Sequence, residues 1–332
     1  MKIFVTSVRA IFIAMLSLAL CQTAMAKESD PLPSWNDGPT KSAIIEFMDK
    51  ATDEYSEQYV PLDERVATFD NDGTLWSEKP LYFQLLFALD RVAQLAKDHP
   101  QWPKTPPFSY VLNGETDKLS TQDILTIVEA THSGMSSDEF DKIVKDWIST
   151  AKHPTTGKPY TSMVFKPMLE LMNYFRSHGF KTFIVSGGGN AFMRAWVSST
   201  YNIPPEQVIG SRMAAEYQLI DGKPQITRLP ELVVNNDKAM KPVEIYQAIG
   251  RRPVAAFGNS DGDLAMLQWT IAGEGPRLAM FVHHTDAKRE WQYDRHSSVG
   301  KLDKGLDEAK AGGWLIADMK KDWKQIYPGD DK

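Results

Sequence analysis

The chain has 332 residues, and its 37 Lys and Arg against 43 Asp and Glu give a formal net charge of −6 at pH 7. Hydrophobic residues make up 42% and charged residues 24% of the chain, which excludes an intrinsically disordered protein, a collagen and a disulfide-rich scaffold. The acidic balance provides no basic surface for nucleic acid, so we expect no nucleic-acid partner.

The first 26 residues have the pattern of a secretory signal peptide. Lys2 and Arg9 precede a mostly apolar run over residues 10–20, and small residues come just before a cleavage site after Ala26. The run is shorter than the roughly 20 residues that span a bilayer. We therefore expect cleavage, a periplasmic or secreted mature protein, and no membrane attachment afterwards. The one Cys of the chain, Cys21, would be removed with the signal, so no disulfide can form.

Strand and helix patterns divide the rest of the chain into three predicted parts. Residues 27–80 begin with a polar leader and a helix over residues 42–59, and they end on a short buried strand over residues 66–69. Residues 81–160 contain helical patterns and no strand-like run, which predicts an all-helical inserted module. The helical patterns of this module cover residues 81–96, 121–131 and 138–150.

Residues 161–332 return to an alternation of strands and helices. The predicted strands cover residues 180–185, 254–257 and 278–282, and the predicted helices cover residues 168–178, 191–201, 243–249, 287–293 and 306–311. Asp221-Gly222 between two extended stretches, over residues 216–225, predicts a β-hairpin. The alternation predicts an α/β fold, with a three-layer core in which helices cover both faces of a parallel sheet.

Three of the predicted strands end in residues that can carry chemistry. In a parallel sheet these strand ends meet at one edge, where ligands bind. The segments are Asp70-Asn71-Asp72-Gly73-Thr74, Ser186-Gly187-Gly188-Gly189 and Gly258-Asn259-Ser260-Asp261-Gly262-Asp263. Lys238 and Lys241 come just before the helix that leads to the third strand.

These residues form a chemically coherent set. Asp70 and Asp72 face the same side of an extended segment, where two carboxylates need a cation or a shared proton. Mg²⁺ meets that need and can also bind a phosphoryl group. One carboxylate can attack phosphorus, and the other can protonate the leaving oxygen and then activate water. Ser186 and the backbone N–H groups of Gly187 and Gly188 can receive phosphate oxygens, and a Lys can balance the charge.

At these residues the sequence resembles the haloacid dehalogenase (HAD) superfamily, in its phosphoserine-phosphatase-like group. Residues 70–74 match the first family motif, Asp-x-Asp-Gly-Thr after a strand, and Ser186 matches the second motif. Lys241 matches the third motif, and residues 258–263 match the fourth, Gly-Asp-x-x-x-Asp. The resemblance implies a Rossmann-like core with the helical module as an inserted cap.

The resemblance also implies a role for each matching residue. Asp70 would be the nucleophile, and Asp72 would be the general acid and base. Lys241 would be the motif lysine, with Lys238 as the alternative. The residues implied for binding the substrate phosphate are Thr74, Ser186, Gly187, Gly188 and Lys241. Asp70, the backbone carbonyl of Asp72 and the fourth motif would bind Mg²⁺.

The fourth motif departs from the family pattern. Asn259 stands where the family has its first carboxylate, and an amide oxygen can bind Mg²⁺ but brings no charge. Asp261 and Asp263 are the other candidate metal ligands of this segment. The sequence leaves open which of the three faces Asp70.

The motifs and the signal pattern together predict an exported, Mg²⁺-dependent phosphomonoesterase that acts on small phosphorylated metabolites through an aspartyl-phosphate. Two alternatives remain: phosphonate- or dehalogenase-type chemistry on the same fold, and a non-catalytic protein that binds a small anionic ligand. A calcium loop is excluded, because Lys79 would stand at a position that needs an acidic ligand. Arg194 is left open between a contact to a substrate anion and the solvated surface. The identity of the phosphomonoester and the oligomeric state stay open.

Overall fold

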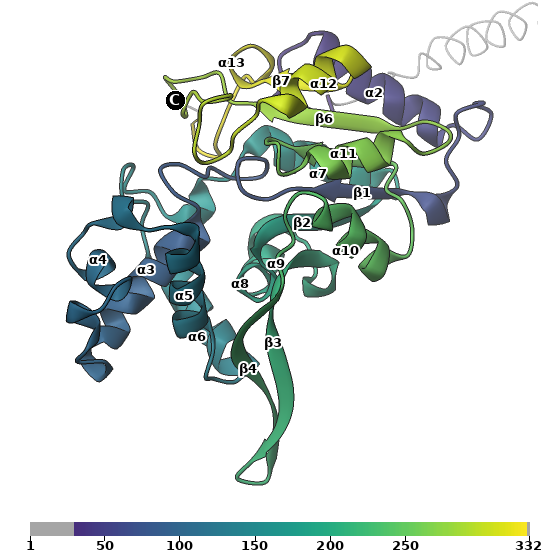
Figure 1. The fold of residues 1–332 in the computed structure, drawn as a ribbon. Helices are drawn as coiled ribbons and strands as arrows, with labels where there is room; N and C mark the ends of the chain where they lie inside the picture. The colour runs from purple at the N-terminus through teal and green to yellow at the C-terminus, as the bar shows by residue number, and fades with distance from the viewer. Residues whose placement is uncertain (1–29, 331–332) are drawn as a thin grey trace, which may run out of the picture. The chain divides into compact units, whose positions relative to one another are not determined.

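A seven-stranded sheet organises residues 30–330, the part of the chain that the computed structural model describes. The strands lie in the order β4-β3-β2-β1-β5-β6-β7 (Figure 1). They are β1 (Val66–Phe69), β2 (Lys181–Gly189), β3 (Val208–Ile220), β4 (Lys223–Val234), β5 (Ala255–Gly258), β6 (Leu278–His283) and β7 (Leu315–Asp318). Neighbouring strands pair in parallel except β3 and β4, which form an antiparallel hairpin. The α/β fold class is confirmed, with a mostly parallel sheet.

Helices cover both faces of this sheet, because successive strand residues point to opposite faces. Ala255 and Phe257 of β5 point into a core that α2 and α7 complete, and Ala256 points into a core that α10, α11 and α12 complete. The helices of the described chain are α2 (Pro39–Thr52), α3 (Phe83–Leu95), α4 (Phe108–Leu112), α5 (Thr121–His132), α6 (Ser137–Thr150), α7 (Lys166–Ser177), α8 (Asn190–Arg194), α9 (Val197–Tyr201), α10 (Met240–Ile249), α11 (Leu264–Ile271), α12 (Lys304–Gly312) and α13 (Met319–Asp322). The three-layer arrangement is therefore present.

Between residues 81 and 160 the structure contains helices and no β-strand, as the sequence predicts for the inserted module. The hairpin of β3 and β4 adds to this region, because β4 lies beside α5 and α6 (Figure 1). Arg228 of β4 fixes the contact: its N–H donates to Met135 O at 2.9 Å, and its carbonyl accepts from Gly134 N at 2.9 Å. The helical module and the hairpin therefore lie together at the edge of the sheet where the strand-end motifs meet.

Three predicted helices differ in the structure. The one over residues 42–59 corresponds to α2, which ends at Thr52 because Asp53 has an extended backbone. The one over residues 191–201 is interrupted between α8 and α9 at Trp196, whose φ of −134° is outside the helical range and whose ring stacks on Trp76. Residues 287–289 form a turn, and the chain then continues without a helix. The N–H of Trp291 donates to Glu290 Oε2 at 2.6 Å, that of Tyr293 donates to His284 O at 3.1 Å, and Gln292 forms an isolated bridge with Thr285, so these amides make no helical hydrogen bonds.

The structure does not test the predicted signal peptide or the predicted lack of membrane attachment after its cleavage. The predicted signal peptide over residues 1–26 lies outside the described residues, and the strands and helices above belong to the unit over residues 32–332. Among residues 30–330, no helix has both the length and the apolar composition to cross a membrane.

Candidate active site

Three strand ends meet at one edge of the sheet, as predicted. β1 lies between β2 and β5, so Asp70 follows the central strand of the three. The N–H of Asp70 donates to Phe257 O at 2.9 Å, which ties the end of β1 to the end of β5. Ser186 lies on the neighbouring β2. The parallel register therefore brings the three predicted motif segments together.

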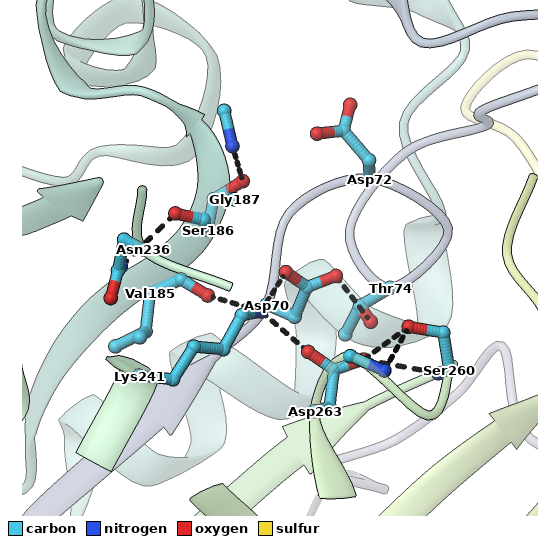
Figure 2. Close-up of polar contacts among 12 residues, drawn as sticks. Asp70, Asp72, Thr74, Val185, Ser186, Gly187, Asn236, Lys241, Ser260 and Asp263 are labelled. Atoms are coloured by element: carbon cyan, nitrogen blue, oxygen red, sulfur yellow. Dashed lines mark hydrogen bonds and ion pairs between the residues drawn. The ribbon is translucent and has the colours of Figure 1, made fainter. Parts of the chain in front are cut away.

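Lys241 joins two of these segments through ion pairs (Figure 2). Its Nζ lies 2.6 Å from Asp70 Oδ1 and 2.5 Å from Asp263 Oδ1, and it donates to Val185 O at 2.9 Å. Lys241 is in the first turn of α10 and is buried, whereas Lys238 lies before the helix and is exposed. Of the two candidate lysines, the structure brings Lys241 to Asp70.

Burial dominates the electrostatics of this cluster. It raises the pKa of Asp70 to about 8; repulsion from Asp263 adds to the rise, and Lys241 opposes it. Burial also raises the pKa of Asp72 and, to a greater extent, that of Glu78. For Lys241, burial lowers the pKa, but the pairs with Asp263 and Asp70 outweigh it and raise the pKa overall. Lys241 is therefore an ammonium at neutral pH.

Asp72 lies beside this cluster and makes none of the contacts drawn in Figure 2. Its Oδ1 accepts a 2.8 Å hydrogen bond from Trp76 Nε1, and Trp76 is fully buried. The indole thus fixes one carboxylate oxygen of Asp72. The Asp72 side chain also lines the cavity at this edge of the sheet.

The C-terminal end of β2 is held by residues that lie outside the four sequence motifs. Ser186 Oγ accepts from Gly188 N at 3.0 Å, and Asn236 Nδ2 donates to Ser186 O at 3.0 Å. Ser211 Oγ donates to Gly187 O at 2.7 Å. Ser211 belongs to β3 and Asn236 to the segment after β4, so only the long-range pairing of the hairpin places them here.

Glu78 and Asn259 form a buried pair next to Asp70. Asn259 Nδ2 and the Tyr293 hydroxyl donate to Glu78 Oε1 at 2.7 and 2.8 Å. Asn259 Oδ1 faces the Thr74 hydroxyl at 3.2 Å, and that hydroxyl lies 3.3 Å from Asp70 Oδ2. Gly73 makes this packing possible, because a Cβ there would lie 2.0 Å from Asn259 Nδ2.

A cavity of about 330 Å³ opens above these groups. Its floor contains Asp70, Asp72, Glu78, Ser186, Lys241 and Asp263. Helices α3 and α5 and the hairpin contribute its upper wall, which is mostly apolar. Cavities of this size hold small ligands.

These strand-end motifs agree with a family comparison. The model for haloacid dehalogenase-like hydrolases matches residues 67–268. The chain belongs to this family. The resemblance to the HAD superfamily is therefore confirmed. No curated protein matches the sequence.

Solved structures resemble the HAD chain at low sequence identity. A conserved protein of unknown function from Anaerococcus prevotii is 16% identical over 87% of this chain and 94% of its own, with a TM-score of 0.52. A phosphoserine phosphohydrolase-like protein from Francisella tularensis is 18% identical over 66% of this chain and 88% of its own, with a TM-score of 0.38. At 16% identity the likeness to the Anaerococcus prevotii protein concerns the fold alone.

Two residues that the HAD motifs implied are placed differently from the prediction. The Asp261 carboxylate accepts the N–H groups of Asp303 and Gly305 at 3.0 and 2.8 Å, so it caps the start of α12 and is not part of the assembled site. Thr74 is fully buried behind Asp70 and does not line the cavity, so it is placed to orient Asp70 rather than to touch a phosphate. Long-range contacts decide both placements.

The HAD site fits a divalent cation if carboxylate side chains, a backbone carbonyl and water act as ligands together. Among residues 30–330 no three Asp, Glu, His or Cys side chains converge closely enough to bind a metal by themselves. Asp70, Asp72 and Glu78 nevertheless line one cavity together with Lys241, whose ammonium pairs with Asp70. Because burial raises the pKa values of these three carboxyl groups, they ionise together only beside a cation. Mg²⁺, which binds carboxylate and carbonyl oxygens and keeps several waters, suits that need. Asp70 and the backbone carbonyl of Asp72 would hold the ion, with Glu78 supplying the charge that Asn259 lacks.

The remaining predicted candidates are occupied by contacts within the protein. Arg194 donates from Nε to Pro205 O at 2.9 Å and from Nη2 to Val208 O at 3.0 Å, so it ties loops together and does not reach a substrate. Asp263 Oδ2 accepts the N–H groups of Asn259 and Ser260, each at 3.0 Å. Asp263 therefore holds its own loop through Oδ2 and Lys241 through Oδ1.

Proposed function

We propose that the chain is a phosphomonoesterase that hydrolyses small phosphorylated metabolites through an aspartyl-phosphate. One observation carries the proposal: the Asp70 carboxylate lies at the floor of the cavity, paired with the Lys241 ammonium, and a second carboxylate, Asp72, is fixed beside it. A nucleophile, an acid and a cation in one small cavity are the groups that phosphoryl transfer needs.

In the first step an Asp70 carboxylate oxygen forms a bond to phosphorus, and the bond from phosphorus to the ester oxygen breaks. Asp72 gives its proton to that oxygen, so the alcohol leaves neutral. Asp72, now ionised, takes a proton from water, and the water oxygen attacks phosphorus. The bond to Asp70 breaks, and inorganic phosphate is released. Lys241 offsets the negative charge that gathers on Asp70 and on the phosphoryl oxygens.

Mg²⁺, when bound, would neutralise phosphoryl charge and orient the group for in-line attack. The chain's own residues prepare for this role. Asp70 Oδ1 faces Lys241, and its Oδ2 has only the 3.3 Å contact to Thr74, so one oxygen of the nucleophile is weakly bonded. The surplus of carboxylates around it supports the Mg²⁺ dependence that the sequence predicts.

The alternative chemistries fit the site less well. A halide leaves without a proton, so the fixed carboxylic acid at Asp72 would have no purpose in a dehalogenase. Phosphonate cleavage through a Schiff base needs a neutral lysine, whereas the pKa of Lys241 is raised by Asp263 and Asp70. The other candidate is a protein of the same fold that binds a small anion without catalysis, and it would bind a phosphate analogue without turnover.

We expect the mature chain to release inorganic phosphate from a panel that includes phenyl phosphate and small aliphatic phosphomonoesters. Removing Mg²⁺ with EDTA should lower the rate by at least about 10²-fold, since a bound metal contributes several kcal/mol to phosphoryl transfer. Re-addition of Mg²⁺ is the control. Tight binding of orthovanadate without turnover of any substrate would instead identify the non-catalytic protein.

We further propose that the protein acts outside the cytoplasm, after removal of residues 1–26. The support is the basic start, the apolar run and the small residues before the cleavage site. In a fractionated bacterial host, the chain should accumulate in the periplasm with Lys27 as its N-terminus, as mass spectrometry can establish. Recovery of the uncleaved chain from the cytoplasm would contradict this proposal.

A further inference from the structure

The upper wall of the active-site cavity is apolar except at Arg228 and a few polar groups. The apolar side chains come from α3, α5, β3 and β4 and are those of Leu85, Ile124, Leu125, Val128, Met213 and Leu232. Arg228 lines the same cavity and is only 9% exposed. A charged group so far from water is costly unless it has a partner.

The protein holds the Arg228 guanidinium without neutralising it. Its Nε donates to His132 O at 2.7 Å, and its carbon lies 4.2 Å from the centre of the Phe140 ring. No carboxylate of the described chain pairs with it, and neither terminal nitrogen bonds to a described protein atom. Burial lowers its pKa to about 10, so it is still a cation at neutral pH.

The group next to Arg228 is a neutral imidazole. The Thr131 hydroxyl donates to Ile127 O at 2.7 Å, so its oxygen accepts from His132 Nδ1 at 2.8 Å. This leaves His132 Nε2 to accept from Gln84 Nε2 at 3.2 Å, while Gln84 Oε1 accepts from Gly189 N at 2.6 Å. Burial, with repulsion from Arg228 and Arg91, lowers the pKa of His132 to about 3. His132 therefore adds no positive charge to this wall.

The position of Arg228 is fixed before any ligand binds. Its backbone pairs with Gly134 and Met135 after α5, and its Nε is bonded, so only the terminal nitrogens remain for a partner. These nitrogens form a planar fork that matches a carboxylate in a bidentate pair. One cation with a neutral neighbour balances a single negative charge, whereas a phosphate of about −1.5 to −2 would leave charge against apolar residues.

We propose that Arg228 binds a carboxylate on the organic part of the substrate, so that the enzyme acts on small phosphomonoesters of hydroxy acids. The phosphoryl group lies at Asp70, the carboxylate lies at Arg228, and the apolar residues between them contact the carbon chain. This inference rests on the proposed function, because it assigns the substrate class of the same cavity. It uses a residue of the β3–β4 hairpin, which none of the four sequence motifs contains.

The test compares pairs of substrates that differ only in the charge at one end. Phosphomonoesters of three- to five-carbon hydroxy acids are assayed against the corresponding hydroxy amides, with phenyl phosphate as a reference. In the wild type we expect kcat/KM to favour the acid by about 10- to 100-fold at the best chain length, mainly through KM, as for a hydrogen-bonded charged pair. This comparison needs no variant.

Two variants then assign the preference to Arg228. Arg228→Gln keeps a donor for His132 O but has no charge, so the acid-to-amide ratio should fall to near one. Arg228→Lys keeps the charge without the fork, and the ratio should be intermediate. Equal use of acids and amides by an active wild type would overturn the inference and leave the proposed function intact. A preference for bisphosphates over acids would also overturn it, and no phosphate release from any substrate, phenyl phosphate included, would instead overturn the proposed function.

Discussion

Replacing Asp70 with Asn is expected to lower kcat for phosphomonoester hydrolysis by about 10⁴-fold or more, because the nucleophile is removed. The fold should survive. Lys241 keeps its pair with Asp263 at 2.5 Å and its bond to Val185 O, and the repulsion between Asp70 and Asp263 disappears. We therefore expect the Tm to stay the same or to rise. Steady-state kinetics and thermal unfolding of the same preparation measure both effects.

A matched control comes from the fourth motif. Asp261, like Asp70, is an acidic residue of a family motif, but its carboxylate binds the first amides of α12. Asp261→Asn should lower stability by about 1 kcal/mol, as for a weakened cap, and leave kcat within about twofold. The two variants thus have opposite signatures. An Asp70→Asn enzyme within about tenfold of the wild type would remove Asp70 from the role of nucleophile.

The sequence predicted the parts of this site that local patterns encode. A short apolar run that stops at Asp70 is a strand end, and parallel pairing then brings Asp70, Ser186 and Asp263 to one edge. The two lysines could not be separated by spacing alone. Lys238 has a φ of 54° and precedes the helix, whereas the first turn of α10 carries Lys241 to the buried carboxylates.

The parts that the sequence did not predict depend on long-range packing. Glu78 and Asn259 are 181 positions apart, and no periodicity connects them. Arg228 was missed because the hairpin was predicted only over residues 216–225, whereas the two strands extend from Val208 to Val234. The longer hairpin carries Arg228 beyond the sheet to the wall of the cavity. The polar residues of these two strands were the one feature of the sequence that could have indicated a role for Arg228.

The pair of Glu78 and Asn259 explains how the site accommodates its departure from the family motif. An amide at position 259 donates to Glu78 Oε1 at 2.7 Å, a bond that a carboxylate at that position could not make. The carboxyl group that the motif usually carries at position 259 therefore has its counterpart in this chain at Glu78, which lines the cavity while Asn259 does not. Replacing Asn259 with the Asp of the family motif, without a second change, should therefore destabilise the protein.

Asn259→Asp is accordingly expected to lower stability by about 2–4 kcal/mol, because two buried carboxylates would face each other at hydrogen-bond distance. The second carboxylate removes the hydrogen bond from Asn259 and raises the already high pKa of Glu78 further, so one of the two groups holds a proton in the folded protein that it does not hold when unfolded. Since the folded state binds more protons, stability should fall as pH rises, so the loss in Tm should be larger at pH 8 than at pH 6. Thermal unfolding at the two pH values measures this.

The double variant Asn259→Asp with Glu78→Gln exchanges donor and acceptor between the two positions. The new amide at position 78 would donate to the new carboxylate at position 259, so the stability lost in the single variant should largely return. Binding of Mn²⁺, a Mg²⁺ substitute measured by calorimetry, should stay weak, because position 259 does not line the cavity. Glu78→Gln alone removes charge without replacing it and should weaken Mn²⁺ binding by about tenfold, or roughly 1.4 kcal/mol. The stability effects of the two changes should therefore be strongly non-additive, as expected for groups in direct contact. Additive losses would show that Glu78 and Asn259 act independently and that the missing motif carboxylate has not been replaced by Glu78.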